Sequence, residues 1–389
     1  METHKPKLRF PEFNEDWIKK TLKDVSTKVN SGKTPLGGEK IYTANGVLFI
    51  RSQNVNNDKL DLKNISYIPE KINFTMKNSI VLPNDILLNI TGASLGRSCV
   101  VPIDFSIGNV NQHVCILRLN ENYNPYFIQP IFSSQKGQDI FVSFQTGGGR
   151  EGLNFDSIKK IELFFPNIKE QTRIANFLSS VDEKINLLKE KKSLLEDYKK
   201  GIMQKLFNQE IRFKDDNGND FEKWQEKRLS EVSTKNSSNV SANKIEDNFG
   251  EYIIYGASGV LKKVDFYLQE NDYISIIKDG AGVGRIFYCL GKTSVLGTME
   301  MIKPNEGIHT YFLYCLLNNI DFTTFITGST IPHIYFKDYS KVKCGIPCFK
   351  EQIKIANFLS AIDKKIELVS NQILDTQEYK KGLLQQMFV

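Results

Sequence analysis

The sequence predicts an α+β protein with a pseudo-two-fold internal repeat: two similar mixed α/β domains separated by two long antiparallel helices that form a coiled-coil spacer. Three observations predict this fold class. A long segment with heptad spacing occurs twice, a shorter segment ahead of it also occurs twice, and the blocks between them contain short strand-like runs. A length of 389 residues suffices for about two to three domains.

The long repeat occupies residues 169–207 and 350–388, and nearly half of its aligned positions are identical. In both copies apolar residues recur at alternating spacings of three and four, which is typical of a coiled-coil seam. The predicted seam residues are Ile174, Leu178, Val181, Ile185 and Leu188 in the first copy and Ile355, Leu359, Ile362, Ile366 and Val369 in the second. Polar residues interrupt the stripe at Lys192, Lys199, Thr376 and Lys380.

Each copy is expected to form one helix of about 37 residues, roughly 55 Å long. Pro166 and Pro347 precede the two copies, where proline cannot interrupt a helix. A lone helix cannot bury its apolar stripe, and two matching halves suggest a pseudo-two-fold axis. We therefore expect the two helices to pack against each other in antiparallel fashion. The alternative is that each helix packs only on its own domain.

A shorter repeat leads into each half. The pattern Trp-x4-Leu-x2-Val-Ser-Thr-Lys begins at Trp17 and again at Trp224. The predicted organisation is a first domain at 1–165, whose leading segment is 1–28, and a spacer helix at 166–207. A second domain follows at 208–346, with its leading segment at 208–235, and a second spacer helix at 347–389.

The blocks between the repeats read as mixed α/β modules. Strands are expected at 47–50, 85–90, 114–119, 252–255 and 273–277, because β-type runs there are separated by Gly, Asn, Ser and Thr turns. Short helices are expected at 125–143 and 309–326. The segment 91–97 aligns with 279–285, and Thr146, Gly147 and Phe155 align with Thr327, Gly328 and Phe336. A duplicated backbone framework with different side chains in its two copies is consistent with two different binding specificities.

Composition excludes several protein classes. Charged residues at 25% and hydrophobic residues at 40% are ordinary for a globular protein. A net charge of +6 is mild beside that of a non-specific nucleic-acid coater. The sequence contains no apolar run of about 18 residues, so no membrane span is predicted. The N-terminus lacks the apolar core of a secretory signal, so no such signal is expected. The six cysteines favour free thiols in a reducing cytoplasm over a zinc site.

These motifs resemble the specificity subunit of type I restriction–modification systems over essentially the whole chain. The resemblance rests on the helix openings at 169–179 and 350–360, their endings at 198–204 and 379–385, and the segments at 148–155 and 327–336. It implies two target-recognition domains that each read one half of an asymmetric, interrupted DNA sequence. It also implies docking of two methyltransferase subunits on the helices, with restriction and translocase subunits joining afterwards. S-adenosylmethionine, ATP and Mg would belong to those partners, so no cofactor is expected in this chain.

The loops supply the residue types that read double-stranded DNA, in which Arg and Lys suit guanine and Asn and Gln suit adenine. The candidates are Arg51, Gln53, Asn54, Arg97, Asn111, Gln112, His113 and Arg150 in the first block and Lys278, Arg285, Thr298, Thr330, His333 and Tyr335 in the second. Any single one could instead be a solvated loop or turn residue, and both histidines could be structural. Arg97 and Arg285 occupy equivalent framework positions, which favours contact with phosphate over base reading.

Two expectations concern affinity and spacing. The recognition blocks are near neutral in charge, so we expect weak DNA binding by this chain alone and tight binding with its partners. The spacer helices are comparable in length with one to two duplex turns of about 34 Å. A change in helix length should therefore change the number of unread base pairs and leave the half-sites unchanged.

No segment of the sequence matches a catalytic or nucleotide-binding motif in full. Gly32-Lys33-Thr34 and Gly291-Lys292-Thr293 lack the upstream glycine of a phosphate loop, and 280–284 is out of register with a dinucleotide fingerprint. The segment 124–127 faintly resembles the Asn-Pro-Pro-Phe motif of amino-methyltransferases, but its counterpart at 309–312 marks a helix start. We therefore expect a non-catalytic subunit. The alternatives are a coiled-coil scaffold with protein-binding side modules and a self-contained nuclease–methylase.

Overall fold

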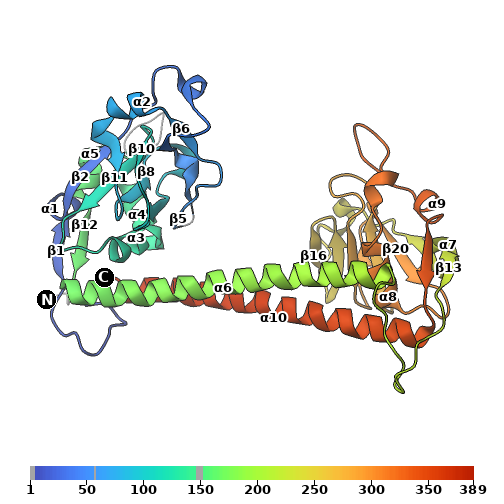
Figure 1. Cartoon of the computed structure of the whole chain (residues 1–389). Coiled ribbons are helices and arrows are strands. Elements are labelled where there is room, and N and C mark those ends of the chain that lie inside the picture. The colour runs from blue at the N-terminus through green and yellow to red at the C-terminus, as the bar shows by residue number, and fades with distance from the viewer. Residues whose placement is uncertain (1–4, 57, 146–151) are drawn as a thin grey trace. The chain divides into compact units, whose positions relative to one another are not determined.

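The computed structural model describes residues 5–56, 58–145 and 152–389, and the chain divides into two compact units. Unit 1 comprises Met1–Leu188 and Gln372–Val389, and unit 2 comprises Lys189–Asn371. The long helices α6 (Ile168–Phe207) and α10 (Phe349–Met387) each pass from one unit into the other. Each unit therefore holds one mixed α/β module together with part of both long helices (Figure 1).

Among its described residues, the module of unit 1 contains two four-stranded sheets, two strand pairs and short helices. Its strands are β1 (Ile18–Thr21), β2 (Ser26–Ser31), β3 (Val47–Ile50), β4 (Val55–Asn56), β5 (Lys59–Leu60), β6 (Ser66–Ile68), β7 (Ile80–Val81), β8 (Ile86–Asn89), β9 (Ser98–Val100), β10 (Gly108–Val110), β11 (Val114–Leu119) and β12 (Glu162–Phe165). Its helices and 3-10 turns are α1 (Leu22–Val25), η1 (Gly38–Ile41), η2 (Ser52–Asn54), α2 (Glu70–Phe74), η3 (Lys77–Ser79), η4 (Gly92–Ser94), α3 (Pro125–Ser133), α4 (Gln135–Ser143) and α5 (Phe155–Lys160).

The antiparallel sheet β2-β11-β8-β9 is buried on both faces. Ile86 and Leu88 of β8 belong to the core that also contains residues of α6, whereas Leu87 belongs to a second core with Val110 of the other sheet. That second sheet has the order β6-β3-β10-β7, in which β3 and β10 run parallel. Burial on both faces explains why β8 is a continuous apolar run without alternation.

The module of unit 2 repeats this plan with a smaller second sheet. Its sheets have the orders β14-β20-β17-β18 and β16-β15-β19, and β15 runs parallel to β19. The strands are β13 (Gln225–Arg228), β14 (Ser233–Ser237), β15 (Tyr252–Gly256), β16 (Gly259–Val264), β17 (Tyr273–Ile277), β18 (Ile286–Cys289), β19 (Ser294–Val295), β20 (Met299–Pro304) and β21 (Lys343–Ile346). The helices and turns are α7 (Leu229–Val232), η5 (Ala242–Ile245), α8 (Thr310–Asn318), η6 (Phe322–Phe325) and α9 (Phe336–Tyr339).

The two expected short helices are each divided. The segment 125–143 forms α3 and α4, because the hydroxyl of Ser134 accepts a hydrogen bond from the Gly137 amide and starts a new helix. Gly137 packs against the α3 backbone, where a Cβ atom would lie 2.1 Å from the Ile131 carbonyl oxygen. The segment 309–326 forms α8 followed by η6, which Asp321 caps. The five expected strands are present as β3, β8, β11, β15 and β17.

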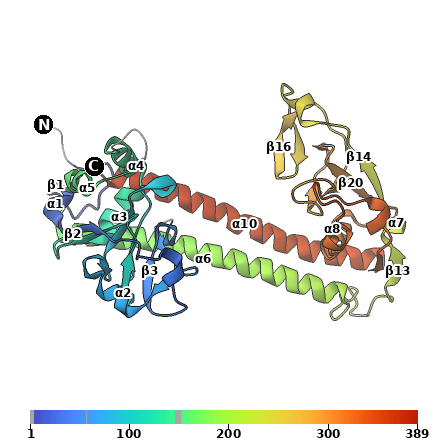
Figure 2. The same cartoon turned by 90° about the horizontal axis from the view of Figure 1, so that it is seen from above.

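The long helices run antiparallel within each unit, as predicted. In unit 1, Leu383 and Met387 of α10 share a core with Ile174 and Leu178 of α6. In unit 2, Leu206 of α6 shares a core with residues near the start of α10, namely Ile355, Ala356, Leu359 and Ile362. Each core also contains module residues, so the helices pack both on a module and on each other (Figure 2). All ten predicted seam residues are buried or partly buried.

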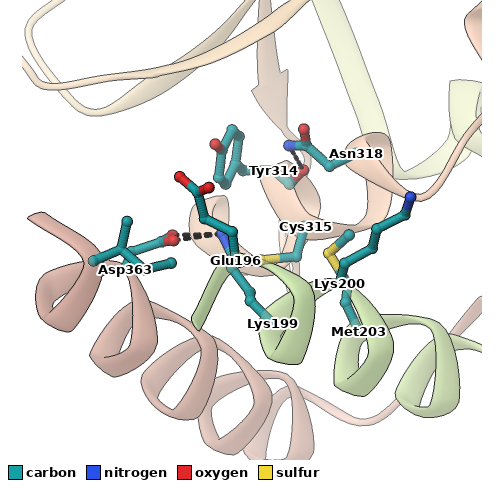
Figure 3. Close-up of a pocket in the computed structure, with 9 residues that line it drawn as sticks. Glu196, Lys199, Lys200, Met203, Tyr314, Cys315, Asn318 and Asp363 are labelled. Atoms are coloured by element: carbon teal, nitrogen blue, oxygen red, sulfur yellow. Dashed lines mark hydrogen bonds and ion pairs between the residues drawn. The ribbon is translucent and has the colours of Figure 1, made fainter. Parts of the chain in front are cut away.

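Two of the polar interruptions of the seam are paired with an aspartate of the opposite helix. In unit 2 the Lys199 ammonium lies 2.6 Å from the Asp363 carboxylate, which also accepts a hydrogen bond from the Tyr311 hydroxyl. Figure 3 shows Lys199 pointing from α6 towards Asp363 on α10. In unit 1 the repeat-equivalent Lys380 lies 2.7 Å from Asp182. Polar pairs at seam positions favour one register of the two helices over others.

The glutamates that open the long helices anchor the leading segments. Glu170 and Glu351 have fully buried side chains. Each accepts two hydrogen bonds from an arginine and one from a tryptophan at 2.7–3.3 Å; the donors are Arg9 and Trp17 in unit 1 and Arg212 and Trp224 in unit 2. The hydrogen bond to the carboxylate raises the pKa of each arginine above its ordinary value. The repeated glutamate therefore connects the start of each helix to its leading segment.

The neighbouring glutamines join the same helix starts to the short helices of the modules. Gln171 accepts a hydrogen bond from the Asn124 amide, at the N-cap of α3, and donates one to the Pro166 carbonyl. Gln352 makes the equivalent bonds with His309, at the N-cap of α8, and with Pro347. The repeated Lys-Glu-Gln opening is thus explained by two buried side chains that join three segments of the chain.

All six cysteines are free thiols, and five of them are buried. Burial raises the pKa of Cys99, Cys115 and Cys315 to about 12. Because the thiolate is the reactive form, we expect an alkylating reagent at neutral pH to modify Cys348, which is partly exposed, well before the other five. Peptide mass mapping after a short iodoacetamide pulse on the native chain would measure this. Equal labelling of all six would contradict the burial.

Within the described residues, no helix is long and apolar enough to cross a membrane.

Candidate nucleic-acid interface

Five strands of unit 1 bring their ends to one edge of the module. The ends of β2 and β8 lie beside the start of β11, since Ser31 pairs with Cys115 and Asn89 pairs with Val114. The parallel strands β3 and β10 end at the same edge, where the Asn111 amide donates to the Ile50 carbonyl. The loops that follow these strands carry most of the predicted DNA-binding residues of the first block.

A chain of hydrogen bonds joins three of these loops. The Thr34 hydroxyl donates to Oε1 of Gln112 at 2.5 Å, and Nε2 of Gln112 lies 3.1 Å from Nε2 of His113. Nδ1 of His113 lies 2.6 Å from the Thr91 hydroxyl. Gln112 is exposed and His113 is half-buried. The structure therefore places both predicted residues together, with their positions fixed from two other loops.

The two described arginines of this edge are held loosely. Arg51 lies 3.4 Å from the Glu39 carboxylate, and its guanidinium lies 5.5 Å from the centre of the Tyr42 ring. The exposed Arg97 donates to Oδ1 of Asn56 at 3.4 Å. Both contacts are long and therefore weak. Arg97 is exposed and can exchange its contact for a charged ligand, whereas the Arg51 side chain is 20% exposed and its Nε is buried without a hydrogen-bond partner among the described residues. Gln53 is exposed on the same edge.

Two predicted residues serve the local backbone instead. Asn54 is 2% exposed, accepts a hydrogen bond from the Arg51 amide and donates to the Asp61 carbonyl. Asn111 is 7% exposed and accepts from the His113 amide. Both hold turns that position their neighbours, and the structure does not present them to a ligand. Arg150, with Thr146 and Gly147, lies outside the described residues.

In unit 2 the equivalent edge is formed by three loops held by backbone hydrogen bonds. The Lys278 amide donates to the Thr298 carbonyl, and the Gly280 amide donates to the Pro332 carbonyl. His333 pairs with both Asp279 and Thr327, which closes a tight hairpin. The structure therefore brings together the predicted residues of the second block, all exposed or half-buried: Lys278, Arg285, Thr298, Thr330, His333 and Tyr335.

Aromatic and cationic groups meet at this hairpin. The His333 ring lies 4.9 Å from the Tyr335 ring in edge-on geometry, and the Lys337 ammonium lies 5.1 Å from the same tyrosine ring. Tyr335 is 49% exposed, so one face of this group remains open. Arg285 is exposed and donates to the Ala257 carbonyl at 3.3 Å. Hydrogen-bond donors of this kind are the groups that read base edges in duplex DNA.

The two edges share one backbone framework. In unit 1 the amide of Asn89 donates to Arg97, and the amide of Gly96 donates back to Asn89. Ile277, Arg285 and Gly284 make the same two bonds in unit 2. Gly96 and Gly284 both have φ of 84°, which only glycine adopts readily. The predicted alignment of 91–97 with 279–285 therefore describes one turn that occurs twice.

The framework also defines which predicted DNA-binding residues occupy equivalent positions. The His113 carbonyl accepts from the residue after β8 and the Thr298 carbonyl accepts from the residue after β17, so these two residues occupy the same place. The returning segments match as well, with Leu153 bonded to Ile90 and Ile334 bonded to Lys278. The same backbone therefore presents different side chains in the two units.

Sequence reasoning missed Thr34 and Thr91. Each holds a predicted reader, but the sequence places them 78 and 22 residues from their partners. Thr91 could have been found from its place at the start of the repeated turn at 91–97. Thr34 has no such signal, since the loop at 32–37 has no recognised counterpart in the second half.

Within the described part of the chain, no group of three or more His, Cys, Asp or Glu side chains is placed to hold a metal ion.

The family model and the similar proteins all point to one protein family. The family model for the type I restriction modification DNA specificity domain matches residues 14–197 and 221–377. A putative type I restriction enzyme MjaX specificity subunit from Methanocaldococcus jannaschii is 24% identical over 412 residues, covering 97% of this chain and 94% of that protein. The EcoBI specificity subunit from Escherichia coli is 29% identical over 151 residues, covering 36% of this chain and 31% of that protein.

Solved structures show the same fold over the whole length. The crystal structure of a type I restriction–modification S subunit from M. genitalium has a TM-score of 0.63 at 18% sequence identity, and the match covers 99% of both chains. A second structure, from work on complex assembly and conformational transition of the type I system, has a TM-score of 0.58 at 14% identity and covers 97% of this chain and 98% of that chain.

Proposed function

Since the chain belongs to the family of type I restriction–modification DNA specificity subunits, we propose that it selects a bipartite, asymmetric DNA target and that each module reads one half of it. The observation that carries the proposal is the pair of equivalent edges, which have one backbone framework and different exposed side chains. A common framework supports the same docking on DNA in both halves. Different side chains on it support two different half-site sequences.

The long helices support docking of two methyltransferase subunits. In unit 1 they expose Leu187, Leu374 and Tyr379, and in unit 2 they expose Leu194, Tyr198 and Leu368, each more than half exposed. Leu187 and Leu368 are repeat-equivalent, as are Tyr198 and Tyr379. These exposed apolar side chains are available for contact with a partner. Their duplication suits two copies of one partner, and restriction and translocase subunits would join that complex.

We assign no reaction to this chain itself. S-adenosylmethionine, ATP and Mg would be bound by the partner subunits, which would carry out methylation, translocation and cleavage in the cytoplasm. The near-neutral modules support weak DNA binding by the chain alone. An affinity in the nanomolar range for the isolated chain at physiological salt would contradict this division of labour, because phosphate contacts dominate such affinities.

The decisive experiment is methylation sequencing of DNA from cells that express this chain together with its methyltransferase. The expected result is one motif with two defined half-sites separated by a fixed number of unspecified base pairs. Filter binding of a duplex carrying that motif, with and without the methyltransferase, tests the scaffold alternative. Absence of any sequence-specific methylation or binding by the assembled complex would overturn the proposal.

Substitution of His113 and of Thr298, which occupy equivalent positions, should each affect the recognition of a different half-site. We expect His113→Ala to relax one base pair of one half-site and Thr298→Ala to relax one base pair of the other half-site. Loss of a base contact costs about 1–3 kcal/mol of discrimination at that base pair. Methylation sequencing of each variant measures the change directly. Relaxation of both half-sites by either single variant would show that the modules do not read independently.

A further inference from the structure

Leu36 is an apolar side chain that the fold leaves uncovered. It is 99% exposed, more than any other large hydrophobic residue described in unit 1. It lies at the apex of the loop between β2 and η1, where Gly37 with φ of 102° and Gly38 with φ of 56° turn the chain back sharply. Burial of a leucine side chain against an apolar group is favourable, so a contact that covers Leu36 would stabilise a complex.

Both arms of this loop are attached to predicted DNA-reading residues. On one arm, Thr34 donates its hydroxyl hydrogen bond to Gln112 at 2.5 Å. On the other arm, Glu39 forms an ion pair with Arg51 at 3.4 Å, and Tyr42 lies under the same guanidinium. The Glu39–Arg51 contact is long and weak, so the loop is held mainly on its first arm, where the Gly32 amide also donates to the Asn111 carbonyl at 3.2 Å. Leu36 is two residues beyond Thr34, so it follows directly from the edge of the module that carries Gln112.

We propose that Leu36 contacts the C5-methyl group of a thymine in the half-site that unit 1 reads. The inference rests on the proposed function and deepens it, because it assigns a base feature to a residue. The Gln112 amide and the Arg51 guanidinium, which contact the two arms of this loop, are groups of the kind that read base edges in the major groove. In that groove the thymine methyl is the apolar group that the bases present. An exposed leucine held at the same edge has this methyl as its matching contact.

Deoxyuridine substitution tests the contact, because it removes the methyl group and leaves base pairing unchanged. Methylation sequencing of the wild-type complex and of His113→Ala first identifies the half-site that unit 1 reads. Each thymine of that half-site and of its flanking pairs is then replaced in turn. Loss of one buried methyl should weaken binding by the wild-type methyltransferase complex about fourfold at a single position, the equivalent of ~0.8 kcal/mol. Leu36→Ala should bind the thymine duplex more weakly and show no further loss with deoxyuridine.

Ile103→Ala is the matched control. Ile103 is 72% exposed and lies between β9 and β10, at the edge opposite the reading loops, so this variant should keep the fourfold dependence on the methyl group. The inference is overturned if no position responds to deoxyuridine in the wild-type complex, or if the response persists unchanged in Leu36→Ala. With either result the complex would still methylate DNA at a specific sequence, so the proposed function would stand. If the proposed function itself failed, the complex would also show no specific binding to the duplex that contains thymine.

Discussion

Replacing Glu351 with alanine is expected to lower the free energy of unfolding of unit 2 by about 3–5 kcal/mol, the usual cost of removing one partner of a buried ion pair. The Glu351 side chain is fully buried and accepts hydrogen bonds from Arg212 and Trp224 at 2.7–3.2 Å. Its loss would leave the indole N–H without its acceptor and the Arg212 guanidinium with only the Phe221 and Glu222 carbonyls, without a counter-charge. Urea denaturation followed by Trp224 fluorescence, in a Trp17→Phe background, measures the change in unit 2.

Two variants serve as controls for this loss. Glu170→Ala, followed by Trp17 fluorescence in a Trp224→Phe background, should cost a similar amount in unit 1, where Arg9 and Trp17 lose the same acceptor. Glu226→Ala removes an exposed ion pair with Lys343, whose side chains are 66% and 62% exposed, and should cost less than about 1 kcal/mol. If Glu351→Ala were no more costly than Glu226→Ala, the buried carboxylate would not hold the helix to the leading segment.

This anchor shows what the sequence alone could and could not predict. The repeat identified the Lys-Glu-Gln openings and the two tryptophans as equivalent features, and the spacing predicted the helices. It did not join the glutamate to the tryptophan, because the two are 153 residues apart in the first half and 127 in the second. The arginines were missed as well, since they stand at unequal distances before Trp17 and Trp224. Contacts between distant segments leave no periodic signal.

The seam was predictable for a related reason. Its apolar residues follow a local period, so the helices could be inferred from spacing. Their antiparallel packing was inferred from the two matching halves of the chain, which suggest a pseudo-two-fold axis. Lys199 and Lys380 were recognised only as interruptions of that period. Their partners, Asp363 and Asp182, lie on the opposite helix, and a partner on another helix cannot be assigned until the register is known.

The reading loops were harder to resolve residue by residue. Asn54 and Gln112 are equally good sequence candidates for adenine, because both side chains carry the amide that reads it. The structure separates them: Asn54 is 2% exposed and bonded to the backbone, whereas Gln112 is exposed. Asn is favoured both in turns and in base recognition, so the residue type alone cannot distinguish the two uses.

Replacing Leu187 and Tyr379 with glutamate is expected to reduce the number of bound methyltransferase subunits from two to one. Both side chains belong to unit 1 and are 57% and 54% exposed. Interface residues of this size contribute about 2 kcal/mol or more when they are binding hot spots, and a carboxylate buried against an apolar partner adds a desolvation cost. The equivalent variant in unit 2, Leu368→Glu with Tyr198→Glu, should prevent binding of the other methyltransferase subunit.

Native mass spectrometry of the co-expressed complex measures the stoichiometry for each variant. The variant carrying all four substitutions should bind no methyltransferase and should abolish methylation in cells. Ile103→Glu is the control, since Ile103 is 72% exposed and belongs to the loop between β9 and β10 rather than to a long helix, and it should retain two subunits. Unchanged thermal unfolding of every variant would show that the substitutions leave the fold intact. Two bound subunits in the fourfold variant would show that the partner docks elsewhere, because four buried charges could not be accommodated at an apolar contact.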